Sequence, residues 1–385
     1  MGLHLPAALE KFICRRSQVM EKSKIRICMI SEAISSHTQR ITESLASSGG
    51  VELHLVSSYH AEIKGVVMHQ MPIYDGNPLK QMINIRRIRK LFKEIGPDIY
   101  HLFGLFSVSS IGSMRLVNGL SPLIVSVWGS DIDSGAEASF KSTLIRKYIL
   151  SKASLVISVS EYLAGETRKY ISPKIRIEVI SWPIHEFHPP EKARPGNGKI
   201  CIGFAKKLYA LSGPDILLKA FAAAKSISKQ DILLRIAGDG AMESELKKMA
   251  DQLGVADSVE WLGRIEGKKH MRAFYHSVDI LAMPSRRESF GMSAAEASAT
   301  GLPIIASRVG GLPEIVEDGV NGFLVESENV QGFAKAISTL AGDPELRIKM
   351  GQKGVEMAGR KFSTEATVGK LISAYRQILE TRRTT

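Results

Sequence analysis

Short apolar runs of strand length alternate with helix-forming segments along most of the chain, and this alternation restricts the fold more than any other feature. Residues 24–30, 51–56 and 122–127 are such runs in the first half, and residues 199–204 and 232–237 start the same alternation in the second half. Apolar strands separated by helices are typical of parallel sheets that are covered by helices on both sides. We therefore predict an α/β fold built on parallel sheets.

Helices are expected between these runs, where apolar residues recur at helical spacing or good helix formers predominate. The expected helices are residues 38–47, 84–95, 216–227, 241–253, 292–300 and 362–379. The glycine fingerprint G-x-G-x-x-G does not follow the first strand, so a dinucleotide site of that type is not expected.

A cluster of prolines and glycines in the middle of the chain predicts a break between two domains. Pro183, Pro189, Pro190, Pro195, Gly196 and Gly198 fall close together, and such density interrupts regular structure. A chain of 385 residues is also long for a single hydrophobic core. We predict an N-terminal extension over residues 1–23, a first domain over residues 24–190 and a second over residues 191–361, followed by a last helical segment, residues 362–385.

The charge balance favours an anionic partner. The chain has 51 lysines and arginines against 39 aspartates and glutamates, a formal net charge of +12. Nucleoside diphosphates, anionic lipids and nucleic acids would all suit such a chain. It carries no zinc-finger, RRM or KH signature, and aromatic residues make up only 6%, so nucleic acid is not an expected partner.

The apolar runs and the cysteines predict a cytoplasmic location. No run approaches the ~20 apolar residues of a membrane span, and Lys11, Arg15 and Arg16 interrupt the first 24 residues, so a signal peptide is not expected. The three cysteines are far apart and form no metal or redox pattern. A reduced compartment, in which these thiols stay free, is therefore expected.

The expected helix over residues 84–95 is strongly basic on one side. Its apolar face consists of Ile88, Leu91, Phe92 and Ile95, and its basic face of Arg86, Arg89, Lys90 and Lys93. One interpretation is a helix that covers a sheet and turns its charged face to solvent. The other is a contact with anionic lipid head groups at the cytoplasmic face of a membrane.

Two glutamates, Glu288 and Glu296, stand eight positions apart between a strand and a helix. The run over residues 278–285 reads as a buried strand that ends at a proline, and residues 292–300 read as the helix that follows. Gly291 lies at the start of that helix, where free N–H groups and the positive end of the dipole suit a phosphate. The alternative is a solvent-exposed loop glutamate and a helix glutamate paired with a nearby base. The shared context of loop, glycine and helix start favours a site.

The stretch from Arg286 to Glu296 resembles the Glu-x7-Glu motif of the retaining "group 1" (family 4-like) glycosyltransferases, which use nucleotide sugars and have the GT-B architecture. The resemblance implies two Rossmann-like parallel-sheet domains that face a central cleft, an acceptor domain first and a donor domain second. It also implies that the segment 362–385 packs back on the first domain. Glu288 would contact the donor sugar and Glu296 the nucleotide ribose.

The donor diphosphate is held by two cations in the family. Lys206 matches the position of the family's arginine and would act with Glu288 in catalysis, whereas Leu211 falls where the family has a lysine, and Lys207 is the candidate to compensate. The alternative is that both lysines are solvated loop residues. The remaining donor-binding residues that the resemblance implies are Gly203, Phe290, Gly291, Met292, Ser293, Arg264 and Ile265. No side chain among them distinguishes uridine, guanosine and adenosine diphosphates.

The acceptor-side residues follow three strands of the first domain. The loop after the first strand contains His37 and Arg40, which could equally be cap and surface residues, and the next candidate is His101. Trp128 and Asp131 fall in the element that the family usually writes as His-Gly-x-Asp. The indole that replaces the usual histidine can donate a hydrogen bond or stack on a sugar ring.

The predicted function is retaining transfer of a sugar from a nucleotide-diphosphate sugar to a hydroxyl acceptor, such as a glycan, a glycolipid or a small metabolite. No acidic cluster suggests a divalent ion, so metal-independent transfer without a further cofactor is expected, as in the family. Because Trp128 and Leu211 depart from the family pattern, a catalytically silent nucleotide-sugar-binding protein is the main alternative. A hydrolase with paired carboxylates and a basic lipid- or nucleic-acid-binding module are further alternatives.

Overall fold

The computed structural model describes residues 24–73, 77–105, 111–129, 131–133, 140–184, 186–191 and 198–384. The predicted extension over residues 1–23 lies outside these residues, as do residues 185 and 192–197 of the predicted linker. The chain divides into two compact units. The first comprises residues 1–126, 139–156 and 371–385, and the second comprises residues 127–138 and 157–370. The predicted domain boundary at residue 190 stays a prediction.

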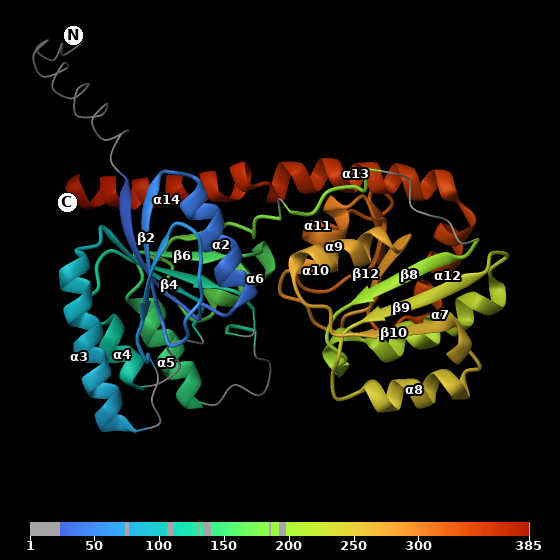
Figure 1. Ribbon diagram of the computed structural model, residues 1–385, viewed down its shortest axis with the longest axis horizontal. Helices are drawn as coiled ribbons and strands as arrows, with labels where there is room; N and C mark the ends of the chain where they lie inside the picture. Colours follow the sequence, from blue (N-terminus) through green and yellow to red (C-terminus); the bar gives the residue numbers. More distant parts are fainter. Residues whose placement is uncertain are drawn as a thin grey trace, which may run out of the picture. The chain divides into compact units, whose positions relative to one another are not determined.

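The first sheet has seven strands in the order β3-β2-β1-β4-β5-β6-β7 (Figure 1). Its strands are β1 (Ile25–Ile30), β2 (Val51–Ser57), β3 (Val66–Gln70), β4 (Ile99–Phe103), β5 (Leu123–Val127), β6 (Leu155–Ser158) and β7 (Ile177–Val179). The pairs from β3 to β5 are all parallel. Strand order therefore reverses between β1 and β4, which confirms a doubly wound α/β sheet.

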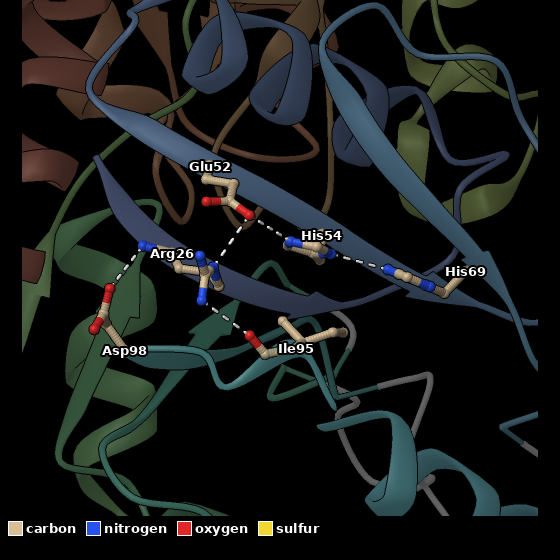
Figure 2. A network of polar contacts seen from close by, with 6 residues as sticks. All are labelled: Arg26, Glu52, His54, His69, Ile95 and Asp98. Atoms are coloured by element: carbon tan, nitrogen blue, oxygen red, sulfur yellow. Dashed lines mark hydrogen bonds and ion pairs between the residues drawn. The ribbon is translucent and has the colours of Figure 1, made fainter. Parts of the chain in front are cut away.

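A polar network crosses one edge of this sheet and ties β3 to the strands inside it (Figure 2). Glu52 on β2 accepts hydrogen bonds from Arg26 and from His54, each 3.1 Å long. The His54 ring in turn contacts the ring of His69 on β3 through a 2.9 Å N···N hydrogen bond. Glu52 accepts both hydrogen bonds as a carboxylate, so they lower the pKa of its carboxyl group. The bond from His54 has the larger effect and the bond from Arg26 the next.

The second sheet has six parallel strands in the order β10-β9-β8-β11-β12-β13. They are β8 (Ile200–Ala205), β9 (Ile232–Ala237), β10 (Val259–Gly263), β11 (Ile280–Met283), β12 (Ile304–Ser307) and β13 (Gly322–Val325). Their apolar side chains and those of the covering helices form the core of this unit, with Phe204, Phe221 and Phe333 fully buried. The order reverses between β8 and β11, so this sheet is doubly wound as well.

Helices cover both sheets. Those before β8 are α2 (Ser36–Ser47), α3 (Pro78–Ile95), α4 (Ile111–Val117), α5 (Phe140–Ser151) and α6 (Glu161–Arg168). Those after β8 are α7 (Pro214–Ile227), α8 (Glu243–Gln252), α9 (Lys268–His276), α10 (Met292–Ala299), α11 (Leu312–Ile315), α12 (Val330–Gly342), α13 (Pro344–Phe362) and α14 (Thr364–Thr384). No helix of the described ranges combines the length and the apolar character that a membrane span requires.

The basic helix is longer than its sequence pattern predicted. We expected it to start at residue 84, but α3 begins at Pro78. The side chain of Asn77 accepts hydrogen bonds from the N–H groups of Leu79 (2.9 Å) and Lys80 (3.3 Å), and proline at the first helical position needs no such bond. The asparagine–proline cap thus adds more than one turn, whose outward residues include Leu79 and Lys80.

Candidate functional site

The two predicted catalytic residues meet at the point where the strand order of the second sheet reverses. Lys206 directly follows β8, and Glu288 follows the neighbouring strand β11. The Lys206 ammonium forms an ion pair with Oε2 of Glu288 and donates a 2.8 Å hydrogen bond to Oγ of Ser285, which is fully buried. The Lys206 and Glu288 side chains are 15% and 19% exposed. Ligands of doubly wound sheets bind at the carboxyl ends of the strands beside this switch point, so the pair occupies the expected ligand position.

The loop that carries Glu288 is shaped by a second loop, the Gly310–Gly311 turn. The N–H group of Gly311 donates a 2.9 Å hydrogen bond to the carbonyl oxygen of Glu288. Gly310 has a φ of +54°, and a Cβ atom at this position would overlap the same carbonyl oxygen. Only glycine fits both the backbone angle and the space, so the turn fixes the backbone from which the Glu288 side chain extends.

The arginine that begins the loop is held by a bidentate ion pair. Arg286 donates from Nη1 and Nη2 to the two carboxylate oxygens of Asp215, at 2.7 and 2.8 Å. Burial alone would raise the pKa of Asp215, but the hydrogen bonds from Arg286 outweigh it, and the pKa is lowered. A fork-to-fork pair of this kind fixes orientation as well as charge.

The helix after the loop starts without a side-chain cap from the described residues. Gly291, with a φ of +107°, precedes the first residue of α10, and a Cβ atom here would lie 2.8 Å from Cδ2 of Leu312. Ser293 does not cap the helix, because its hydroxyl donates a 2.7 Å bond to the carbonyl oxygen of Ala205 at the end of β8. The first N–H groups of α10 therefore suit an anion near Lys206.

The second glutamate of the motif is buried and bonded to a tyrosine. Glu296, 8% exposed, lies in the second turn of α10. The hydroxyl of Tyr275, a fully buried residue on α9, donates a 3.0 Å hydrogen bond to its Oε2. The bond fixes the carboxylate, and the sequence did not single out Tyr275.

The loop after β5 packs against the loop that carries Glu288. The Asp131 carboxylate accepts hydrogen bonds from the N–H groups of Trp128 (3.0 Å) and Gly129 (2.8 Å), so it shapes this loop. A Cβ atom at Gly129 would lie 2.9 Å from Oγ of Ser289. The guanidinium of Arg287 lies 3.5 Å from Asp133. The structure thus brings two predicted acceptor-side residues, Trp128 and Asp131, next to the neighbours of Glu288.

Two family models match most of the chain. Residues 26–160 match the glycosyl transferase 4-like model, and residues 187–357 match the model for glycosyl transferases of group 1. The chain belongs to the group 1 glycosyltransferases. The D-inositol 3-phosphate glycosyltransferase of Corynebacterium urealyticum is 34% identical over 244 residues, which are 58% of this chain and 56% of that protein. This group 1 chain therefore spans about half the length of the curated relatives it matches first.

Solved structures share the fold of this group 1 chain. The sucrose-phosphate synthase of Thermosynechococcus elongatus superimposes with a TM-score of 0.78 at 20% identity, over 93% of this chain and all of that one. HepE of Anabaena, in complex with UDP and glucose, superimposes with a TM-score of 0.73 at 18% identity, over 94% of this chain and all of that one. The predicted GT-B architecture, with two Rossmann-like parallel-sheet domains, is confirmed.

Three of the residues predicted to bind the donor have surroundings that differ from those of the Lys206–Glu288 pair. The Phe290 ring is buried edge-to-face against Phe362, with 5.6 Å between ring centroids, so only its backbone could face a donor. Gly203 lies inside β8, where a Cβ atom would lie 2.9 Å from a methyl group of Val278, and packing alone accounts for this glycine. Lys207 is exposed, with its ammonium 6.0 Å from the Tyr209 ring centre.

The remaining donor residues lie around the same sheet. Arg264 and Ile265 follow β10, two strands from β8, and Arg264 is exposed with its Nε 3.4 Å from Glu266. Met292 begins α10 and is half-buried. Leu211 is 55% exposed, and its carbonyl oxygen accepts a 2.9 Å bond from the N–H group of Arg286. Its backbone therefore supports the loop that carries Glu288. The described residues contain no group of three or more potential metal ligands.

Three predicted acceptor-side residues lie in the first unit. His37 and Arg40 are on the first turns of α2, and burial, followed by the nearby charge of Arg40, lowers the pKa of His37 to about 4. His101 on β4 is fully buried, with its ring nitrogens 2.7 Å from the hydroxyl groups of Tyr375 and Ser126. Since both nitrogens already have partners inside the unit, we assign His101 a structural role and leave it out of the proposed site.

Replacing Tyr275 by phenylalanine should weaken binding of the predicted nucleotide-sugar donor and leave the predicted transfer step nearly unchanged. The change removes only the hydroxyl that orients Glu296, and one such bond contributes about 1 kcal/mol. We expect the KM for the donor to rise about fivefold at nearly constant kcat, as measured by initial rates.

The matched control for this prediction is Tyr375→Phe. Tyr375 is equally buried and also donates or accepts one hydrogen bond, with His101. It should lower the melting temperature by a similar amount without changing the donor KM. A rise in KM that is the same in both variants would show that lost stability, and not the orientation of Glu296, is responsible.

His101 should make this unit less stable in mild acid. Burial lowers its pKa to about 3, from an ordinary value of 6.5. The unfolded chain therefore takes up the proton first, and stability that is complete above pH 6.5 is lost as the pH falls towards 3, by about 1.4 kcal/mol per pH unit. Urea unfolding of the wild type and of His101→Gln at several pH values measures this slope. Equal slopes would contradict it, because His37 titrates in both proteins.

Proposed function

We propose that this chain transfers a sugar from a nucleoside-diphosphate sugar to a hydroxyl acceptor, with retention at the anomeric carbon and without a metal ion. The observation that carries the proposal is the Lys206–Glu288 pair, which lies at the switch point of the second sheet beside the uncapped start of α10. A cation, an uncapped helix start and a carboxylate in one place suit a molecule that joins a diphosphate to a sugar.

The difficult step is departure of the nucleoside diphosphate from the sugar. Negative charge grows on the phosphate oxygens while positive charge grows on the sugar ring. The Lys206 ammonium and the first N–H groups of α10 would stabilise the leaving group. Glu288 would hold sugar hydroxyls and favour the cationic ring. Before a donor arrives, the two side chains neutralise each other, so neither charge is left uncompensated in a largely buried position.

The nucleoside would extend from the diphosphate towards Glu296. The Glu296 carboxylate is oriented by Tyr275 and has two acceptor oxygens, which suit the two hydroxyl groups of a ribose. The complex of Anabaena HepE with UDP and glucose supports a nucleotide-sugar donor, and uridine diphosphate sugars are the first donors to test. For the acceptor we propose a glycan, a glycolipid or a small metabolite, with inositol phosphate included because of the relatives' names.

A donor–acceptor panel tests the proposal. Melting temperatures with UDP, GDP and ADP identify the nucleotide, and release of that nucleotide from its sugars is then followed with and without acceptors. NMR of the product gives the anomeric configuration. We expect acceptor-dependent release, a retained configuration and full activity in EDTA. An inverted product, or loss of activity in EDTA that Mg²⁺ restores, would overturn the corresponding part of the proposal.

A silent nucleotide-sugar-binding protein is the second candidate. It rests on Trp128 in place of the family's histidine and on Leu211, whose apolar side chain cannot neutralise a phosphate. A chain that binds a nucleotide sugar by calorimetry, but releases no nucleotide with any acceptor of the panel, would be this protein.

A further inference from the structure

Three neighbouring helices lie on one face of the first sheet. The connections β3-α3-β4, β4-α4-β5 and β5-α5-β6 all move in the same direction along the sheet, whereas β1-α2-β2 moves in the opposite direction. Because such crossovers are right-handed, α3, α4 and α5 cover one face and α2 covers the other (Figure 1). Helix α4 packs against both α3 and α5. Arg89 of α3 fixes this arrangement by donating a 2.6 Å hydrogen bond to the carbonyl oxygen of Arg115 on α4.

This three-helix face holds much of the positive charge of the chain. It has one acidic residue, Glu94, and ten basic ones: Lys80, Arg86, Arg87, Arg89, Lys90, Lys93, Arg115, Lys141, Arg146 and Lys147. All of the basic residues except Arg146 are exposed. A single-sign field over three adjacent helices attracts an extended anionic surface more than a single small anion.

Exposed apolar side chains accompany the charge in the same pattern on two of these helices. On α3, Leu79 (69% exposed), Ile83 (46%) and Arg86 follow each other at helical spacing. On α5, Phe140 (80%), Leu144 (50%) and Lys147 have the same spacing. Residues i, i+4 and i+7 share one side of a helix. Each helix therefore presents two large apolar side chains near its N-terminal end, and a basic residue follows them on the same side of the helix.

The two apolar pairs lie at the same end of the unit. Helices that connect parallel strands run opposite to the strands, so the N-terminal ends of α3 and α5 both lie at the carboxyl ends of the strands. Ionic groups alone would serve a nucleic acid, which needs phosphate contacts and base stacking but no exposed leucine and isoleucine. Peripheral membrane proteins are held on lipid by a combination of two groups. Their apolar side chains enter the membrane–water interface, and basic side chains beside them attract anionic lipids.

We propose that the face formed by α3, α4 and α5 docks on an anionic lipid bilayer. Leu79, Ile83, Phe140 and Leu144 enter the head-group region, and the exposed basic residues of the face contact lipid phosphates. The proposal is independent of the transfer reaction, since none of these residues belongs to the site around Lys206. Each basic residue near such a surface strengthens binding about fivefold.

Flotation of the full chain with vesicles tests this docking. The vesicles consist of phosphatidylcholine alone or of phosphatidylcholine mixed with phosphatidylglycerol. We expect flotation with the mixed vesicles only, and its loss when the ionic strength rises to about 1 M. Replacing Arg86, Arg87, Lys90 and Lys93 by glutamine should weaken partitioning more than about 100-fold. The variant Leu79→Ser/Ile83→Ser/Phe140→Ser/Leu144→Ser keeps every charge and should weaken it about tenfold or more.

The matched control removes the same charge elsewhere, by replacing the exposed Lys248, Lys269, Lys335 and Lys349 with glutamine. It should partition within about threefold of the wild type, because these lysines are not on the three-helix face. The proposal is overturned if the control loses as much vesicle binding as the variant of Arg86, Arg87, Lys90 and Lys93. It is also overturned if the wild type binds neutral vesicles as well as mixed ones. Tighter binding to duplex DNA than to mixed vesicles, unaffected by the serine substitutions, would also overturn it and identify a nucleic-acid surface.

Discussion

Replacing Lys206 by alanine is expected to lower kcat by about 100- to 1,000-fold. That is the loss found when one preorganised group that stabilises charge in a transition state is removed. Lys206 is the cation paired with Glu288, and its largely buried position strengthens its interaction with charge that develops on a leaving diphosphate. The measurement is the initial rate of nucleotide release at saturating donor and acceptor.

Lys207→Ala is the matched control, because this lysine is next in sequence but exposed beside Tyr209. We expect it to change kcat less than about tenfold, since exposed charges are screened by solvent. An equal loss of kcat in the two variants would contradict a catalytic role of Lys206. Melting temperatures identify any part of the loss that comes from unfolding, because Lys206→Ala leaves Glu288 without its ion-pair partner.

Replacing Gly310 by alanine is expected to cost about 3 kcal/mol or more of stability and to reduce kcat more than about tenfold. The positive φ accounts for about 1 kcal/mol. The remainder arises because the new methyl group would overlap the carbonyl oxygen of Glu288, so one of the two loops must move. Any movement displaces the Glu288 carboxylate, and small misplacements of catalytic groups are costly. Urea unfolding and initial rates measure the two effects.

Gly319→Ala separates the strain from the collision. Gly319 also has a positive φ, +76°, but a Cβ atom there meets nothing within 4 Å. This variant should lose about 1 kcal/mol of stability and keep its kcat. If Gly310→Ala behaves in the same way as Gly319→Ala, the Gly310–Gly311 turn does not position Glu288.

The strand–helix alternation was sufficient to predict the α/β class and most of the elements. The buried run over residues 278–285 and the helix after it lie where they were predicted, because apolar strands and well-punctuated helices are encoded locally. The start of α3 was wrong by six residues, although Asn77 followed by Pro78 is a recognised cap signal. Apolar periodicity outweighed that signal in the prediction.

The geometry of the candidate site depends on contacts between distant segments, which no local pattern reveals. Lys206 reaches Glu288 across 82 positions, and only the adjacency of β8 and β11 brings them together. Tyr275 reads as an ordinary apolar helix residue until its hydroxyl is seen to meet Glu296. His101 is a third example, because its hydrogen-bond partner Tyr375 is 274 positions away. A histidine that looks functional in the sequence is a satisfied core residue in the fold.

A crystal structure with a bound nucleoside diphosphate would show directly whether the Lys206–Glu288 pair marks the donor site. The nucleotide is whichever of UDP, GDP and ADP raises the melting temperature most. We expect a terminal phosphate oxygen about 3 Å from the Lys206 ammonium and from the first N–H groups of α10, with the ribose beside Glu296. A diphosphate bound elsewhere, with the Lys206–Glu288 pair unchanged, would contradict it.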